Sequence, residues 1–115
     1  MNYERTRQDC EEIHERDSWQ CCHINEYADR CPNRSTEIAH GMSKGKYGRQ
    51  KVKSFWMLLF GERITINGKK MDFIIHHPLN VWASCRQHND YFIISSYEDF
   101  KEKLLEIKKN IDKSL

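Results

Sequence analysis

Two segments of the chain carry hydrophobic residues at the spacing of an α-helix. Residues 49–60 place four of them on one side of a helix, at Val52, Phe55, Trp56 and Leu59. Residues 95–115 repeat the pattern at Phe100, Leu104, Ile107 and Ile111. The second segment opens with Ser95 and has Glu98 three residues later, which is typical of an N-terminal capping box. We therefore predict two amphipathic helices, and a shorter charged helix over residues 4–18.

Shorter segments between these helices predict two strands. In residues 35–40, polar and hydrophobic side chains alternate enough to predict a short strand that ends at His40. A loop that contains several glycines follows. Residues 80–84 predict a second strand. A further helix is expected from near residue 85 through residue 92. The irregular segment between residues 21 and 31 contains a polar insert and has no clear periodicity.

Length and composition limit what this fold can bury. The chain has 115 residues, of which 38% are hydrophobic and 31% are charged, so only a modest core is expected and another stabilising element is needed. No apolar run approaches the roughly 20 residues that cross a bilayer. Residues 1–6 lack the apolar segment of a signal peptide. These features predict a protein without a membrane span in the reducing interior of the cell.

Positive charge is concentrated in the middle of the chain. The net charge is only +2, but residues 41–70 contain eight basic side chains and one acidic one. This region includes Asn67-Gly68, a pair that favours a type I′ turn, so a basic hairpin over residues 64–71 is expected. Such a segment suits a polyanionic partner, although a solvated lysine-rich loop explains the charge equally well.

Cysteine and histidine spacing indicates a structural zinc site. Zinc in such sites is held by four Cys or His side chains, usually as two closely spaced pairs. Cys85 and His88, with two residues between them, form one pair. Cys31 belongs to the other pair. Its partner is Cys21, with nine residues between them, or Cys22, with eight residues between them. We favour Cys22, with His23 as a third choice.

Buried thiols without a metal are the simpler explanation of the same residues. The chain has five cysteines, and in a reducing compartment cysteines are metal ligands or free thiols more often than disulfides. Cys10 lies apart from the other four and is expected to take no part in the site.

His40 and Asn89 have the chemistry that phosphodiester hydrolysis requires. A histidine titrates near neutral pH, so it can accept a proton from an attacking water. An asparagine carbonyl oxygen suits a hard divalent ion such as Mg²⁺ or Mn²⁺, which offsets charge on the phosphate.

The chain resembles the HNH endonuclease superfamily, the ββα-metal or His-Me finger nucleases. The spacing from Cys31 to His40 is that of zinc-containing members. Asn80-Val81-Trp82-Ala83-Ser84-Cys85 matches the family's middle segment. Cys85-Arg86-Gln87-His88-Asn89 matches its end, with His in place of the last Cys and Asn in place of the last His. The resemblance covers residues 20–94. It implies an α+β fold, a small ββα-metal domain spanning the 115 residues, with a basic hairpin insertion and flanking helices.

The resemblance also implies a role for each matched residue. His40 would be the general base, Asn80 would tie the loop between the strands so that His40 is held in place, and Asn89 would ligate the catalytic ion. The family usually has a second metal ligand directly before the catalytic His, but here that residue is Ala39. In the family, a His often lies four positions after the last motif residue. In this chain the corresponding residue, four positions after Asn89, is Ile93.

Other side chains are candidates for the missing ligand and for DNA contacts. His77 is the first candidate ligand, with His76 beside it, and Glu37 and Asp90 are further oxygen donors. Three basic residues are expected to contact DNA phosphates: Arg49, Lys51 and Lys53.

Two functions follow from these expectations. The first is a DNA endonuclease, monomeric or homodimeric, of the kind found in phages and mobile elements. The alternative is a catalytically inactive zinc-stabilised module that binds nucleic acid or a protein.

Overall fold

The computed structural model of the chain describes residues 7–60 and 74–113, and these residues group into two compact units. The described part of unit 1 comprises residues 42–60, 74–80 and 94–113. That of unit 2 comprises residues 7–41 and 81–93. Helices and a two-stranded antiparallel sheet make an α+β fold, as expected. The expectation of one nuclease-like domain with a core over residues 20–94 stays a prediction.

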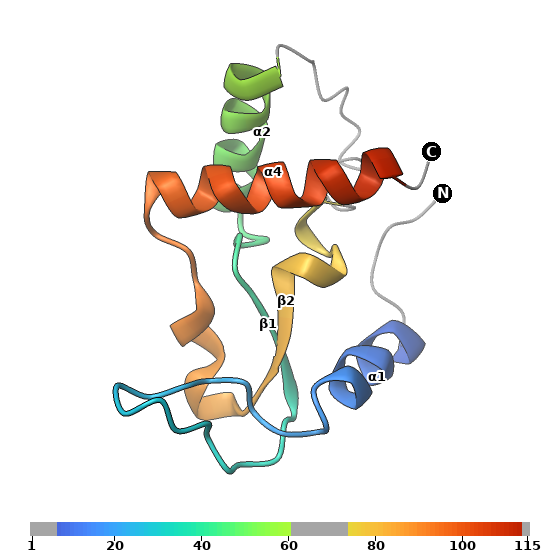
Figure 1. The fold of residues 1–115 in the computed structure, drawn as a ribbon, viewed down its shortest axis with the longest axis vertical. Coiled ribbons are helices and arrows are strands. Elements are labelled where there is room, and N and C mark those ends of the chain that lie inside the picture. The colour runs from blue at the N-terminus through green and yellow to red at the C-terminus, as the bar shows by residue number, and fades with distance from the viewer. Residues whose placement is uncertain (1–6, 61–73, 114–115) are drawn as a thin grey trace. The chain divides into compact units, whose positions relative to one another are not determined.

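Unit 2 contains the sheet, formed by β1 (Glu37–His40) and β2 (Val81–Ser84). Helix α1 (Arg7–Arg16) and the 3-10 helix η2 (Arg86–Phe92) both contact these strands. Figure 1 shows the two strands side by side, although about 40 residues of chain separate them. Both predicted strands are therefore present, and β1 ends at His40 as predicted.

The register of the sheet sorts its side chains onto two faces. Ala39 pairs with Trp82 and His40 pairs with Val81. Because directly opposed residues share a face, Ala39 and Trp82 lie on one side of the sheet. The Trp82 ring stacks on Phe92 of η2, with 5.6 Å between the ring centroids.

Unit 1 contains α2 (Lys46–Phe60), the 3-10 helix η1 (Pro78–Asn80) and α4 (Tyr97–Lys113). Helix α4 lies across α2, and their contact includes Phe55 against Phe100, with ring centroids 5.1 Å apart (Figure 1). The buried core of this unit consists of Met42, Val52, Ile74, Ile75, Phe100, Leu104 and Ile107. The apolar spacing seen in the sequence thus correctly identified the inner faces of both helices.

Helix boundaries differ from the predictions in small ways. Helix α2 begins three residues earlier than expected, and Leu59 is half-buried. The capping serine of α4 is Ser96, not Ser95, because the Ser96 hydroxyl accepts a hydrogen bond from Asp99 N–H (3.4 Å). The predicted hairpin over residues 64–71 and the side chain of Ile111 lie outside the described residues.

The predicted helix after Cys85 is a 3-10 helix, η2. In this conformation residues i and i+3 lie on the same side of the helix. The His88 N–H donates to the Cys85 carbonyl oxygen (3.2 Å), an i to i+3 bond. The tighter turn therefore brings the side chains of Cys85 and His88 toward the same point.

Gly48 permits a close approach at the start of α2. A Cβ atom at this position would lie 2.1 Å from the Ser43 carbonyl oxygen. Ser43 itself forms a tight turn in which its hydroxyl accepts a hydrogen bond from Gly45 N–H (3.1 Å). Only glycine allows the loop after β1 to pack this closely against α2.

Within the described residues, none of the helices is long and apolar enough to cross a lipid bilayer.

Candidate functional site

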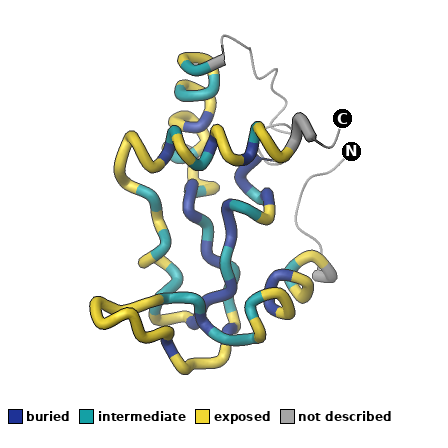
Figure 2. The backbone as a smooth tube through the Cα atoms, viewed as in Figure 1, coloured by how far each residue is buried: buried dark blue, intermediate teal, exposed yellow. Residues whose placement is uncertain are grey.

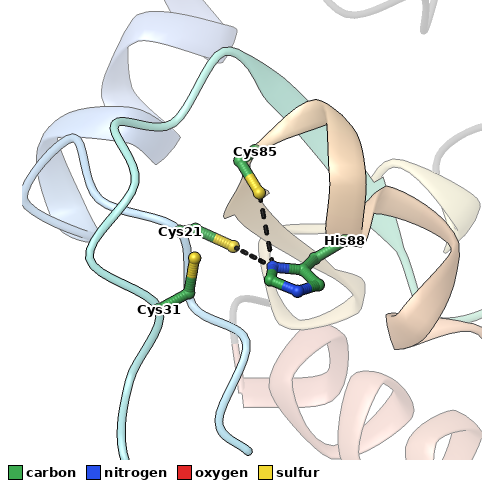
Figure 3. A group of neighbouring side chains, drawn as sticks. All are labelled: Cys21, Cys31, Cys85 and His88. Carbon is green, nitrogen blue, oxygen red and sulfur yellow. Dashed lines mark hydrogen bonds between the residues drawn. The ribbon is translucent and has the colours of Figure 1, made fainter.

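Four side chains of unit 2 converge in one buried group: Cys21, Cys31, Cys85 and His88 (Figure 3). Their sulfur and nitrogen atoms all lie within 4.8 Å of one another. The Nδ1 atom of His88 is 3.3 Å from Cys85 Sγ and 3.7 Å from Cys21 Sγ. Cys85 and His88 are more than 50 residues from Cys21 and Cys31 in the sequence, so the fold creates the site.

The two sulfur–nitrogen distances measured in this group suit a tetrahedral metal ion. Zinc–sulfur and zinc–nitrogen bond lengths place two sulfurs about 3.8 Å apart and a sulfur and a nitrogen about 3.6 Å apart. The measured sulfur–nitrogen distances of 3.3 and 3.7 Å are close to that value. The group can therefore hold a metal ion, and Cys31, Cys85 and His88 are members as predicted.

Backbone hydrogen bonds hold the ligand segments in place. Cys21 N–H donates to Asn33 O (2.9 Å), and Cys31 N–H donates to His23 O (2.8 Å). The side chain of Asn33 also donates to Cys85 Sγ (3.7 Å). The ring of His23 stacks on His88, with 4.2 Å between their centroids, and limits its rotation.

The local environment shifts the pKa of two of the thiols in opposite directions. Burial raises the pKa of Cys21. Burial also acts to raise the pKa of Cys85, but hydrogen bonds from the Asn33 side chain and the His88 backbone outweigh it, and this pKa is lowered. Because the thiolate is the form that binds metal, Cys85 is the better prepared of the two.

The preference for Cys22 is corrected by the structure, because Cys21 occupies that position in the cluster. Of the two adjacent cysteines, only Cys21 faces the group. The Cys22 thiol instead lies near Gln20 O (3.9 Å) and interacts with Asp17. Burial and Asp17 raise the pKa of Cys22 to about 11. The Cys22 thiol therefore interacts with Asp17 and is not a member of the cluster.

The long gap between Cys21 and Cys31 is closed by a compact loop. The Asn25 side chain accepts hydrogen bonds from the backbone N–H groups of Tyr27 and Asp29 (2.9 and 3.0 Å). Ala28 has a φ of 65°, a left-handed conformation that is unusual for a residue with a side chain. His23, the third choice as ligand, flanks the group but is not a member.

His40 and Asn89 both belong to unit 2, whose strand β1 contacts η2. His40 is the last residue of β1 and is half-buried, and Asn89 is half-buried on η2. Ala39 is completely buried on the sheet face that carries Trp82. Its methyl group offers no metal ligand at the position where the family usually has one.

Asn80 is completely buried in unit 1, and three hydrogen bonds satisfy its side chain. Its Oδ1 accepts from Met42 N–H (2.6 Å). Its Nδ2 donates to Met42 O (3.1 Å) and to Ile75 O (2.6 Å). Asn80 thus fixes both backbone polar groups of Met42, the second residue after His40.

His77 is buried in unit 1 and is already hydrogen-bonded, so the structure does not present it as a metal ligand. Its Nδ1 accepts from Leu79 N–H (3.2 Å), and the ring also hydrogen-bonds the Asn110 side chain. Burial lowers the pKa of His77 and so favours the neutral ring.

The remaining candidate ligands lie in different settings. His76 is half-buried in unit 1, Glu37 is half-buried at the start of β1, and Asp90 is exposed on η2. Within residues 7–60 and 74–113, the Cys3His group is the only cluster of three or more His, Cys, Asp or Glu side chains with metal-binding geometry.

The three basic candidates for DNA contact are all exposed on α2. Successive helical residues are rotated by about 100°, so Arg49 and Lys53 share a face, whereas Lys51 points away from it. A single DNA backbone lying along α2 would therefore meet Arg49 and Lys53 but not Lys51.

Asp17 is a structural residue that the sequence did not reveal. Its carboxylate accepts hydrogen bonds from Ala83 N–H (2.8 Å) and from the Arg16 guanidinium (2.9 Å). Arg16 also donates to Val81 O (2.8 Å). Burial acts to raise the pKa of Asp17, but these hydrogen bonds outweigh it and lower the pKa. No spacing rule links Asp17 to β2, so no signal in the sequence indicated this contact.

Comparison with family models, with curated proteins and with solved structures found no match to this chain.

Proposed function

We propose that this chain is a metal-dependent endonuclease of HNH type that hydrolyses DNA phosphodiester bonds, with zinc as a structural ion. The single observation that carries the proposal is the arrangement around Asn80. Its side chain bonds both backbone groups of Met42, two residues after His40. This is the positioning role that the resemblance assigns to the central asparagine.

His40 is the proposed general base. It ends β1, where the register pairs it with Val81, the residue that directly follows Asn80. The chain is thus fixed on both sides of His40, by the sheet before it and by the Asn80 hydrogen bonds after it. With its backbone already ordered in this way, His40 can accept the proton of the attacking water without the cost of ordering that backbone.

Asn89 is the proposed protein ligand for a catalytic Mg²⁺ or Mn²⁺, which when bound would offset charge on the phosphate. A single amide oxygen binds a divalent ion weakly, and the Ala39 side chain supplies no second ligand. We expect affinity for this ion to be low without DNA, because phosphate oxygens would complete its coordination.

The Cys3His group is the proposed zinc site. All four positions are protein ligands, which is typical of a structural site, whereas catalytic zinc keeps an open position for water or substrate. Zinc here would hold β2 and η2 to the segment that precedes β1.

The test is cleavage of supercoiled plasmid with and without Mg²⁺ or Mn²⁺. We expect wild-type protein to cut only with the ion, and His40→Ala to lose about 100-fold or more in rate, as is typical when a general base is removed. Glu12→Gln, on the exposed side of α1, is purified in parallel and should match wild type. Equal activity of His40→Ala and wild type would reject the assigned mechanism.

A gain-of-function variant tests the same site independently. Ala39→Asp restores an oxygen ligand at the position where the family has one. If His40 and Asn89 form a metal site, this variant should need less Mn²⁺ for half-maximal cleavage than wild type. Because Ala39 is buried, folding of the variant is first checked by zinc content and circular dichroism.

The burial of Ala39 favours a second candidate function, a zinc-stabilised module that binds nucleic acid without cutting it. This function predicts DNA binding through Arg49 and Lys53 that weakens with salt, and no cleavage with any divalent ion. Plasmid assays on zinc-loaded wild-type protein distinguish the two candidates.

A further inference from the structure

Figure 2 colours the buried residues of the chain dark blue. Among the described residues, the two units have separate buried clusters of different chemical character. The cluster of unit 1 has seven hydrophobic residues, including Leu104 and Ile107, which are completely buried. The cluster of unit 2 consists of the three cysteines of the metal centre. No residue belongs to both clusters.

Unit 2 therefore has little hydrophobic burial to offset the entropy of its ordered backbone. Ordering a residue costs about 1–2 kcal/mol, and burying a large apolar side chain returns about 1.5–3 kcal/mol. Within residues 7–41 and 81–93, the buried hydrophobic side chains besides the cysteines are Ile13, Ala39, Val81 and Ala83, and two of these are alanines. Small scaffolds of this kind usually need a metal or disulfide in addition to their core.

Buried polar groups weaken unit 2 further. The Ser84 hydroxyl is buried and has no hydrogen-bond partner among the described residues, which costs free energy. His14 is also buried, where its Nδ1 pairs with Ser35 Oγ at 2.7 Å. Burial lowers the pKa of His14, so its neutral form is favoured there.

We propose that metal occupancy of the Cys3His group switches unit 2 between a folded and an unfolded state, while unit 1 stays folded in both. The proposal rests on the zinc staple of the proposed function but not on nuclease activity. Under this proposal, strand β1 and its last residue, His40, are ordered only in the metal-bound protein. The hydrogen bonds between Asn80 and Met42 lie within unit 1 and persist without metal.

Amide hydrogen exchange on the full chain tests this switch. In unit 2, Ala83 N–H donates to Asp17 and Ser35 N–H donates to Trp19 O (2.9 Å). In unit 1, Met42 N–H donates to Asn80, and Phe100 N–H donates to Ser96 O (3.0 Å). With a zinc chelator we expect exchange to accelerate by about 100-fold or more at the two unit 2 amides, with little change in unit 1. Added Zn²⁺ should restore protection.

Adjacent cysteines give a matched control. With zinc present, Cys21→Ser should reproduce the metal-free exchange pattern, whereas Cys22→Ser should behave as wild type. Loss of protection in both units together, or continued protection of unit 2 without metal, would overturn the proposal. So would the absence of zinc binding by wild-type protein. If the exchange pattern is seen but no plasmid is cut, the switch stands and the nuclease proposal fails.

Discussion

At the residue scale, side-chain direction decides which of two adjacent cysteines faces the metal centre. Both Cys21 and Cys22 satisfy the sequence pattern, and only the local backbone distinguishes them. The Cys22 N–H donates to Ala83 O (2.9 Å), which fixes the backbone of this residue to β2. With the backbone held there, Cys21 points into the cluster and Cys22 toward Asp17.

We predict that Cys21→Ser abolishes stoichiometric metal binding and that Cys22→Ser does not. Serine is a poor zinc ligand, and Cys22 cannot replace Cys21 without breaking its bond to Ala83. Co²⁺ substitution checks this, because tetrahedral thiolate coordination gives characteristic visible absorption. Intact Co²⁺ spectra in Cys21→Ser would contradict the assignment, as would their loss in Cys22→Ser.

At the element scale, the helices form where hydrophobic periodicity and end signals agree, and single residues fix where they begin. Helix α4 has two serines in succession at its start, and the sequence predicted Ser95 as its cap. The helix begins at Tyr97, and the serine directly before it is Ser96, whose hydroxyl accepts a hydrogen bond from Asp99 N–H and whose carbonyl oxygen accepts one from Phe100 N–H.

We predict that Ser96→Ala lowers the free energy of unfolding by about 1 kcal/mol, the usual cost of losing an N-cap. Ser95→Ala, one residue earlier, should cost much less. Urea unfolding followed by circular dichroism measures both variants. Equal destabilisation by the two variants would show that the cap is not confined to Ser96.

At the scale of the whole molecule, each unit contains one buried histidine whose pKa is below its ordinary value of 6.5. They are His14 in unit 2 and His77 in unit 1, and burial is the main cause for both. The unfolded chain therefore binds more protons than the folded protein near and below that pH. The free energy of unfolding must then rise as the pH increases through the range in which these histidines titrate, and fall as the solution is acidified.

We predict that the free energy of unfolding decreases as the pH is lowered from 7.5 to 5, and that the decrease is smaller in His77→Gln. Glutamine retains hydrogen-bonding capacity but does not titrate. Metal-ligand protonation acts in the same direction, so both proteins are compared with the chelator present. An unchanged pH dependence in His77→Gln would exclude His77 as a contributor.

The sequence determined those features that depend on local pattern. Helical spacing identified the buried faces of α2 and α4, and alternation identified the strand that ends at His40. The spacing of Cys85 and His88 indicated a ligand pair, because residues three apart in a tight turn face one point. Such features need only neighbouring residues and could be predicted.

Tertiary structure alone decided the features that depend on distant segments. It selected Cys21 over Cys22, directed the His77 ring to Leu79 and Asn110, and joined Asp17 to Ala83. It also separated the hydrophobic core of unit 1 from the cysteine cluster of unit 2. The physical reason is that spacing specifies which side chains can share a face of one element. Packing between elements specifies which atoms then come within bonding distance.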